Sequence, residues 1–302
     1  MGGGLKREAY NQRFSLAEPI KESSCIERTA EDILRIGSYT IQKTPQGWQL
    51  TKNGKTLGTY PKAIIKEGRV LLSMGKGMLL EVTPQGHREV LSIHKARLIA
   101  GVCGDGSITR SSRCHELKFI NTDDKLLEMY FEALKKVYGI DQPYVAIDHR
   151  KHKPVIHVHV GKSAIVEDVY KYCKKEGVEY WRVPLKYLDP EAAIEFINFY
   201  FSCDGSFDHR PQKGTREIIF KSCSRDALQD IKCLLESYFD VRSHFRAPEY
   251  DKEGRRRYHK LVISGCENLR KLFLHGFTSY RSNHQKIIDE LRRWALGESH
   301  GL

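Results

Sequence analysis

Two short stretches of this 302-residue chain share one arrangement, which constrains the fold more than any other feature of the sequence. LIAGVCGDGSI (98–108) and FINFYFSCDGSF (196–207) each join an apolar helical run to an Asp-Gly-Ser turn. Each stretch opens one copy of a long internal repeat, in which helix, two strands, helix, two strands and helix follow in order. We therefore expect two halves related by approximate twofold symmetry.

The segments around these stretches predict the remaining organisation. HELKFIN (115–121) and VIHVHV (155–160) alternate apolar and polar residues, which predicts antiparallel strands with one face on a core and one face free. Short β-like runs, with the turn TPQG at 44–47 and again at 83–86, predict a small β-rich module. We expect an α+β fold with two pseudo-symmetric αββαββα halves. Its segments are a leader or arm (1–34), the β-rich module (35–90), the first repeat (91–177), and the second repeat with an amphipathic C-terminal helix (178–302).

The charge balance indicates the class of partner. The chain has 50 Lys and Arg against 38 Asp and Glu, a formal net charge of +12, which favours a polyanionic partner such as nucleic acid. No apolar run approaches the length of a membrane span, and the start of the chain lacks the apolar stretch of a secretory signal. Without Cys-x-x-Cys pairs or zinc-like spacing, we expect a soluble intracellular protein with reduced thiols, in the cytoplasm or in an organelle.

Asp105 and Asp204 are the candidate functional residues of the two stretches. Asp-Gly is a common turn dipeptide, because glycine permits positive φ and the aspartate side chain caps the turn, so one such pair alone is explained by a turn. Two pairs, each ending an apolar helix and each followed by Ser and an apolar residue, indicate more. If the helices pack together, with Ala100 and Gly104 forming a small-residue face, the carboxylates converge, and a divalent metal ion would offset their repulsion.

With both acids in place, the chain resembles the LAGLIDADG homing endonucleases in their single-chain, two-motif form. LIAGVCGDG (98–106) and INFYFSCDG (197–205) are the two motif copies, and the resemblance extends over about residues 91–276. Phe199 stands where the motif has its first glycine, and Cys103 and Ser202 replace its inner Asp. The resemblance implies antiparallel, saddle-shaped sheets and a monomer, because both halves lie in one chain.

The same resemblance implies metal-dependent phosphodiester hydrolysis. The cofactor would be Mg²⁺ or another divalent cation such as Mn²⁺. The implied metal-binding set is Asp105, Asp204 and the backbone carbonyls of Gly104 and Cys203. A basic residue would lie beside the attacking water or the phosphate. The candidates are Lys118 and Lys221 on the second strand of each copy, with Asn121 as a polar helper and Lys260 and His159 as alternatives.

Family members lay each sheet along the major groove of DNA, so the hairpin tips are expected to contact bases and phosphates. Four loops at corresponding places in the two copies are rich in Arg, Lys and His. Solubility is a sufficient explanation for one such loop, but it explains four loops at matching positions less well. His157 and His159 share a strand face, where groove contact or a structural role is favoured over a metal site. The expected DNA-contacting residues are Arg110, Arg113, Arg150, Lys153, Arg210, Lys213, Arg216, Arg255, Arg256 and Arg257.

The leading hypothesis is a site-specific double-strand DNA endonuclease with a long asymmetric target, as in intron homing. The chain shows no N-terminal nucleophile and no His-Asn ending, so a free-standing or intron-encoded protein is expected rather than an intein. One alternative is an RNA maturase that binds intron RNA, and another is a catalytically silent DNA-binding regulator on the same scaffold. A third is an unrelated basic α/β domain whose Asp-Gly turns are structural.

Overall fold

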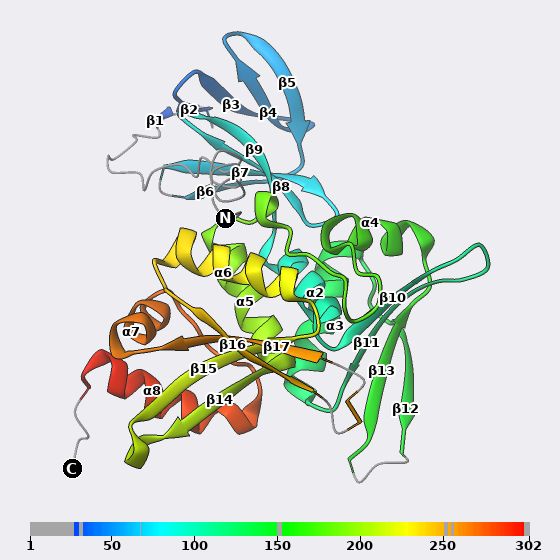
Figure 1. Cartoon of the computed structure of the whole chain (residues 1–302). Helices are drawn as coiled ribbons and strands as arrows, with labels where there is room; N and C mark the ends of the chain where they lie inside the picture. Colours follow the sequence, from blue (N-terminus) through cyan, green and yellow to red (C-terminus); the bar gives the residue numbers. More distant parts are fainter. Residues whose placement is uncertain are drawn as a thin grey trace, which may run out of the picture. The chain divides into compact units, whose positions relative to one another are not determined.

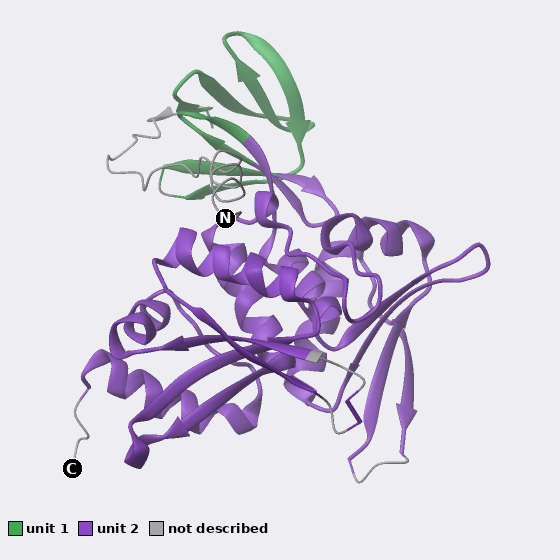
Figure 2. Ribbon diagram, viewed as in Figure 1, with its two compact units in different colours: residues 1–72, 81–87 green, residues 73–80, 88–302 purple. Residues whose placement is uncertain are grey.

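The computed structural model describes residues 27–29, 33–66, 68–149, 153–250, 253–254 and 257–298. The chain divides into two compact units, Met1–Leu72 with Glu81–His87, and Ser73–Leu80 with Arg88–Leu302 (Figure 2). The predicted leader lies outside the described residues, apart from β1 (Glu27–Thr29) and the start of β2 (Ile33–Ile36).

The N-terminal strands form two antiparallel sheets, in the orders β1-β2-β3-β4-β5 and β6-β7-β8-β9, as the short β-like runs predicted. Both TPQG sequences make hairpin turns of the same kind: the Thr44 hydroxyl donates to the carbonyl of Gly47 (2.9 Å), and the Thr83 hydroxyl donates to that of Gly86 (3.3 Å). The further strands are β3 (Tyr39–Thr44), β4 (Gly47–Lys52), β5 (Lys55–Tyr60), β6 (Ala63–Lys66), β7 (Arg69–Gly75), β8 (Met78–Thr83) and β9 (Gly86–Leu91).

The two repeats follow, each with the predicted element order (Figure 1). The first contains α2 (Ile93–Cys103), β10 (Gly106–Arg110), β11 (His115–Asn121), α3 (Asp124–Tyr138), β12 (Tyr144–Asp148), β13 (Val155–Val160) and α4 (Ser163–Cys173). The second contains α5 (Pro190–Asp204), β14 (Gly205–Arg210), β15 (Thr215–Ser222), α6 (Arg225–Phe239), β16 (His244–Tyr250), β17 (Arg257–Ser264) and α7 (Cys266–Leu274). The C-terminal helix α8 (Gln285–Leu296) comes after them.

The two sheets have equivalent antiparallel topologies, β10-β11-β13-β12 and β14-β15-β17-β16. Since each second strand pairs with the fourth and each third strand is at the edge, the halves are pseudo-symmetric in strand order as well as in element order. The structure confirms the predicted α+β fold with two αββαββα halves. The helices α2 and α5, which carry the motif copies, pack against each other.

Local sequence signals explain where the helices begin. Side chains of Ser92, Asp123, Asp189 and Ser224 accept hydrogen bonds from backbone N–H groups in the first turns of α2, α3, α5 and α6. Such caps satisfy donors that have no partner inside the helix. The Pro190 ring adds a preset φ at the first position of α5.

The core of the repeats lies between the sheets and their helices. Leu117 and Phe119 of β11, like Ile218 and Phe220 of β15, are buried members of one apolar cluster that includes both motif helices. Because side chains alternate along a strand, the intervening residues, such as Lys118, lie on the opposite face. None of the helices that the structure describes combines the length and the hydropathy that a bilayer crossing requires.

Candidate metal and DNA site

The two motif helices are in close contact near their C-terminal ends. A Cβ placed on Gly104 of α2 would lie 2.4 Å from the Cβ of Cys203 in α5, and one on Gly101 would lie 2.9 Å from the ring of Phe199. Phe199, which replaces a motif glycine, is fully buried. Ala100 and Gly104 were expected to form the small face; Gly101 is the additional position that makes room for Phe199.

This packing places Asp105 and Asp204 at the ends of the two helices. Asp204 is the last residue of α5, and Asp105 follows Gly104, the C-cap of α2. Burial, and next the negative charge of Asp204, raises the pKa of Asp105 to about 7; burial also raises the pKa of Asp204. The carboxyl groups are therefore close enough to repel each other, in surroundings that disfavour ionisation.

Asn121, the last residue of β11, orients Asp105. Its Nδ2 donates to Asp105 Oδ2 at 2.7 Å, and its Oδ1 accepts the backbone N–H groups of Thr122 (2.8 Å) and Asp123 (3.0 Å). The same strand ties down the backbone, because the carbonyl of Asp105 accepts the N–H of Ile120 at 2.9 Å. The structure thus brings Asn121, expected as a polar helper, into direct contact with the first acid.

Lys175, which no sequence pattern indicated, lies at the end of α2. It follows α4, is 4% exposed, and donates to the carbonyls of Val102 and Cys103, both at 2.8 Å. Those carbonyls have no partner within the helix, so the ammonium caps them and complements the negative end of the helix dipole. Its charge also lowers the pKa values of both aspartates, against the effect of burial.

Arg281 is the corresponding cation of the second half and was also missed. It follows α7, and its Nη2 donates to the carbonyl of Cys203 at 3.0 Å and to Asp105 Oδ2 at 3.4 Å. Each repeat therefore supplies a basic residue, located after its last helix, to the carbonyls that end its motif helix. That shared position was the available signal, although basic residues are frequent throughout the chain.

The donors at the helix ends fit a hard divalent cation. The two aspartates are the carboxylates at these helix ends; within the described residues, no group of three or more His, Cys, Asp and Glu is arranged to hold a metal ion. Mg²⁺ takes oxygen ligands and is commonly held by one or two carboxylates, with water and phosphate oxygens completing the shell. A cation would also offset the repulsion between Asp105 and Asp204. The carbonyl of Cys203, a predicted ligand, accepts from Arg281 here.

The predicted catalytic lysines lie on the strands and away from these contacts. Lys118 pairs with Glu116 at 3.2 Å, and the same carboxylate bonds to His159 Nδ1 at 2.7 Å. Lys221 lies opposite Lys260 in the register of β15 and β17. Among the described contacts, no hydrogen bond or ion pair joins either lysine to the two aspartates, so their catalytic role stays a prediction.

The best-defined of the predicted DNA-contacting residues are held in exposed ion pairs. Arg110 makes a two-pronged pair with Glu167 (2.8 and 2.9 Å), and Arg210 makes one with Asp208 (2.7 and 2.6 Å). Exposed ion pairs are screened by solvent and salt, so DNA phosphates can compete with these carboxylates for the guanidinium groups.

The other predicted DNA-contacting residues are less constrained. Arg216 lies over the ring of Trp294, 4.7 Å from its centre. The exposed members are Arg113, Lys153 and Lys213. Arg150, Arg255 and Arg256 lie outside the described residues, and Arg257 begins β17. Contact of this set with DNA stays a prediction.

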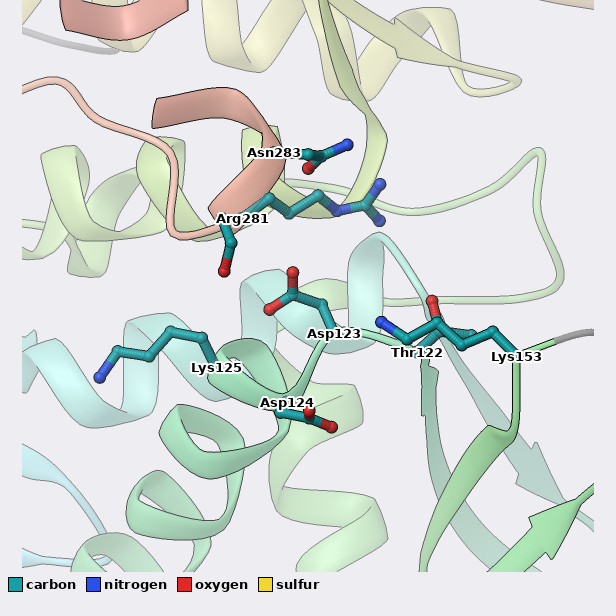
Figure 3. A pocket seen from close by; sticks show the side chains of 8 residues that line it. Thr122, Asp123, Asp124, Lys125, Lys153, Arg281 and Asn283 are labelled. Atoms are coloured by element: carbon teal, nitrogen blue, oxygen red, sulfur yellow. The ribbon is translucent and has the colours of Figure 1, made fainter. Parts of the chain in front are cut away.

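An open cavity of about 340 Å³ lies beside Arg281, between the start of α3 and the segment that precedes α8. Figure 3 shows Arg281 and Asn283 on one side and Asp123, Asp124 and Lys125 on the other. The lining residues are Thr122, Asp123, Asp124, Lys125, Lys153, Arg281, Ser282 and Asn283. The cavity therefore joins residues of both halves next to the acid-bearing helix ends.

The fold and the motif acids agree with a known class. Residues 191–275, from the first turn of α5 to the end of α7, match the family model of the LAGLIDADG-like domain. This part of the second half is thus similar to a LAGLIDADG-like domain, in agreement with the resemblance indicated by the two motif copies.

Two relatives show how far the similarity extends along the chain. The A subunit of the A-type ATP synthase from Pyrococcus abyssi is 26% identical over 255 residues, which cover 77% of this chain and 23% of that protein. A probable translation initiation factor IF-2 of Methanocaldococcus jannaschii is 26% identical over 202 residues, covering 64% of this chain and 16% of that protein. The chain thus spans less than a quarter of the length of these relatives.

Solved structures with some likeness to this chain include homing endonucleases. Mesophilic variants of I-DmoI (TM-score 0.43, covering 65% of this chain and 96% of that one) and I-DmoI in complex with DNA and Mn (TM-score 0.42, 65% and 96%) are each 12% identical. Full-length DUF199/WhiA from Thermatoga maritima is also 12% identical (TM-score 0.44, 66% of this chain and 60% of that one).

Proposed function

We propose that this chain is a site-specific double-strand DNA endonuclease that hydrolyses phosphodiester bonds with a divalent cation, Mg²⁺ or Mn²⁺, held by Asp105 and Asp204. The observation that carries the proposal is the pair of partly buried carboxyls at the ends of two packed motif helices. Holding two like charges together in partly buried surroundings costs free energy. A bound divalent cation would offset that free-energy cost.

The residues around the acids have distinct roles in this proposal. When bound, a divalent cation supplies an activated water and neutralises charge that develops on the phosphate. Asn121 holds the Asp105 carboxylate in one orientation, and Lys175 holds the end of α2. Lys118 and Lys221 are the proposed basic residues beside the phosphate, and both act from strands that would face the DNA.

Double-stranded DNA is the proposed partner, and two further observations support it. The formal charge of +12 favours a polyanion, and the ion-paired arginines at the strand ends can exchange carboxylates for phosphates.

The two relatives carry unrelated names, and each shares only a minor part of its length with this chain. A segment that recurs in unrelated proteins supports a mobile module, as homing requires, and one chain with both halves would act as a monomer.

Cleavage of a randomised plasmid library by the purified protein with Mg²⁺ tests the proposal. Discrete double-strand cuts are expected, and EDTA, Asp105→Asn and Asp204→Asn should each abolish them while DNA binding persists. Asp289→Asn, on the exposed face of α8, is the matched control and should cut normally. Cuts that survive in the two motif variants would contradict the proposal.

A DNA-binding regulator or RNA maturase on the same scaffold is the second candidate. The contacts of Arg281 with Asp105 and the carbonyl of Cys203 favour it, because the guanidinium engages atoms that a metal ion would need. Tight, salt-sensitive binding without any cut would support this candidate, and comparing DNA with intron RNA as competitors would then separate regulator from maturase.

A further inference from the structure

The segment that carries Arg281 is attached to the second motif helix. Asn198 of α5 donates to the carbonyl of Gly276 (3.1 Å) and accepts the N–H of Thr278 (3.0 Å). Ser202 of α5, which replaces the inner Asp of the motif, accepts the N–H of Tyr280 at 2.8 Å. Both polar side chains are buried. The second motif helix therefore fixes the backbone immediately before Arg281.

From this fixed backbone, the guanidinium reaches across to the other half. Its Nη2 lies 3.0 Å from the carbonyl of Cys203 and 3.4 Å from Asp105 Oδ2. These two acceptors lie at the ends of different motif helices, and both are oxygens of the kind that a divalent cation takes. A cation and the guanidinium therefore compete for the same atoms.

Arg281 differs from Lys175 in that its side chain borders open space into which it can move. Lys175 is 4% exposed and bonds to carbonyls, whereas the side chain of Arg281 is 29% exposed and lines the cavity of Figure 3. Its Nε is buried without a hydrogen-bond partner among the described residues. The Lys175 contact has the geometry of a permanent helix cap, while the Arg281 contact is incomplete and borders open space.

We propose that Arg281 is a resident counter-ion of the acid pair, which a divalent cation displaces from Asp105 and from the carbonyl of Cys203 and which thereby sets the affinity for that cation. This inference rests on the proposed metal site at Asp105 and Asp204. In the metal-free protein the guanidinium limits the repulsion between the two acids. On displacement it turns towards the cavity, beside Lys153, where a phosphate oxygen can replace the carboxylate.

Binding of Mn²⁺ to the DNA-free protein, measured by calorimetry and by loss of the free-ion EPR signal, tests this proposal. Arg281→Gln should bind Mn²⁺ about tenfold or more tightly than the natural chain, because it removes a positive charge and frees two oxygens. Lys125→Gln is the matched control: it lines the same cavity, but its side chain is 58% exposed and screened, so a change under about twofold is expected.

Two further variants keep the outcomes distinguishable. Arg281→Lys preserves the charge but reaches the two acceptors less well, so an intermediate affinity is expected and guards against a folding defect in Arg281→Gln. Adding Asp105→Asn to Arg281→Gln should abolish the tight binding. If the natural chain and Arg281→Gln bind Mn²⁺ equally at an Asp105-dependent site, the counter-ion role is wrong and the proposed function stands. If none of the proteins binds Mn²⁺, the metal site of the proposed function fails, and the counter-ion role fails with it.

Discussion

Substituting Gly104 with alanine should separate the two motif helices. Gly104 has φ −78° and ψ −97°, so its φ suits alanine, but the added methyl lacks space. The added methyl would lie 2.4 Å from the Cβ and 3.2 Å from the Sγ of Cys203. Carbon atoms in contact lie about 3.5–4.0 Å apart. The helices must therefore move by roughly 1 Å at this level, because a Cβ cannot rotate away.

The loss of stability in Gly104→Ala depends on how little the contact between α2 and α5 can adjust. Overpacking a buried contact costs typically about 1–3 kcal/mol. The upper end is expected for Gly104→Ala, since Gly101 already lies against the ring of Phe199. Cys203→Gly costs about 1–2 kcal/mol alone, because it removes buried atoms and adds a glycine to a helix. In the double variant the clash is gone, so we expect a favourable coupling of about 2–3 kcal/mol.

Denaturant unfolding followed by the fluorescence of the buried Trp181 measures this double-mutant cycle. The matched control is Gly161→Ala, where the nearest atom to the new methyl is 3.9 Å away, so stability should change by less than about 0.5 kcal/mol. Additive effects of Gly104→Ala and Cys203→Gly would refute the reasoning, as would a cost for Gly104→Ala no larger than that of the control.

Three further predictions concern charge and capping. In EDTA the raised pKa of Asp105 means that its contribution to stability is complete below about pH 4 and is lost as the pH rises through about 7. Asp105→Asn should therefore be more stable than the natural chain at pH 8, by up to about 4 kcal/mol, and equally stable at pH 4. A difference in melting temperature that does not depend on pH would contradict this prediction. Lys175→Met should lower the free energy of unfolding by about 2 kcal/mol because it leaves two buried carbonyls without a donor, and unchanged urea denaturation would exclude that role. Asp189→Ala should cost about 1 kcal/mol through loss of the N-cap of α5, which thermal melting would detect and Asp189→Asn should largely restore.

The sequence predicted the frame of the site because short-range patterns determine it. Cap residues explain the starts of α3, α5 and α6, and strand alternation predicted which strand faces are buried. The repeat then doubled every such signal. The N-terminal module shows the same logic on a smaller scale, since identical TPQG turns in both sheets close hairpins with the same Thr-to-Gly hydrogen bond.

The sequence located the acids of the site but not its cations, and the reason is physical. An aspartate carboxylate lies close to its own backbone, so a motif that locates the helix end also locates Asp105 and Asp204. Lysine and arginine side chains extend much further, and a chain with 50 of them offers many positions from which a cation could reach the same point. Lys118 was a reasonable candidate by position, but its ammonium pairs with Glu116 on the sheet face.

Lys175 and Arg281 reach the ends of the motif helices because each follows the last helix of its half, where the chain turns back towards them. The positions of these turns depend on how α4 and α7 pack, and periodicity does not encode that packing. The symmetry of the repeat nevertheless constrains this packing. A cation that caps the C-terminal end of one motif helix implies an equivalent position for a cation at the end of the other. The two places are filled differently: the buried lysine contacts carbonyls, and the partly exposed arginine also contacts a carboxylate. This asymmetry makes the second half the one in which charge compensation can change when a metal ion or a phosphate arrives.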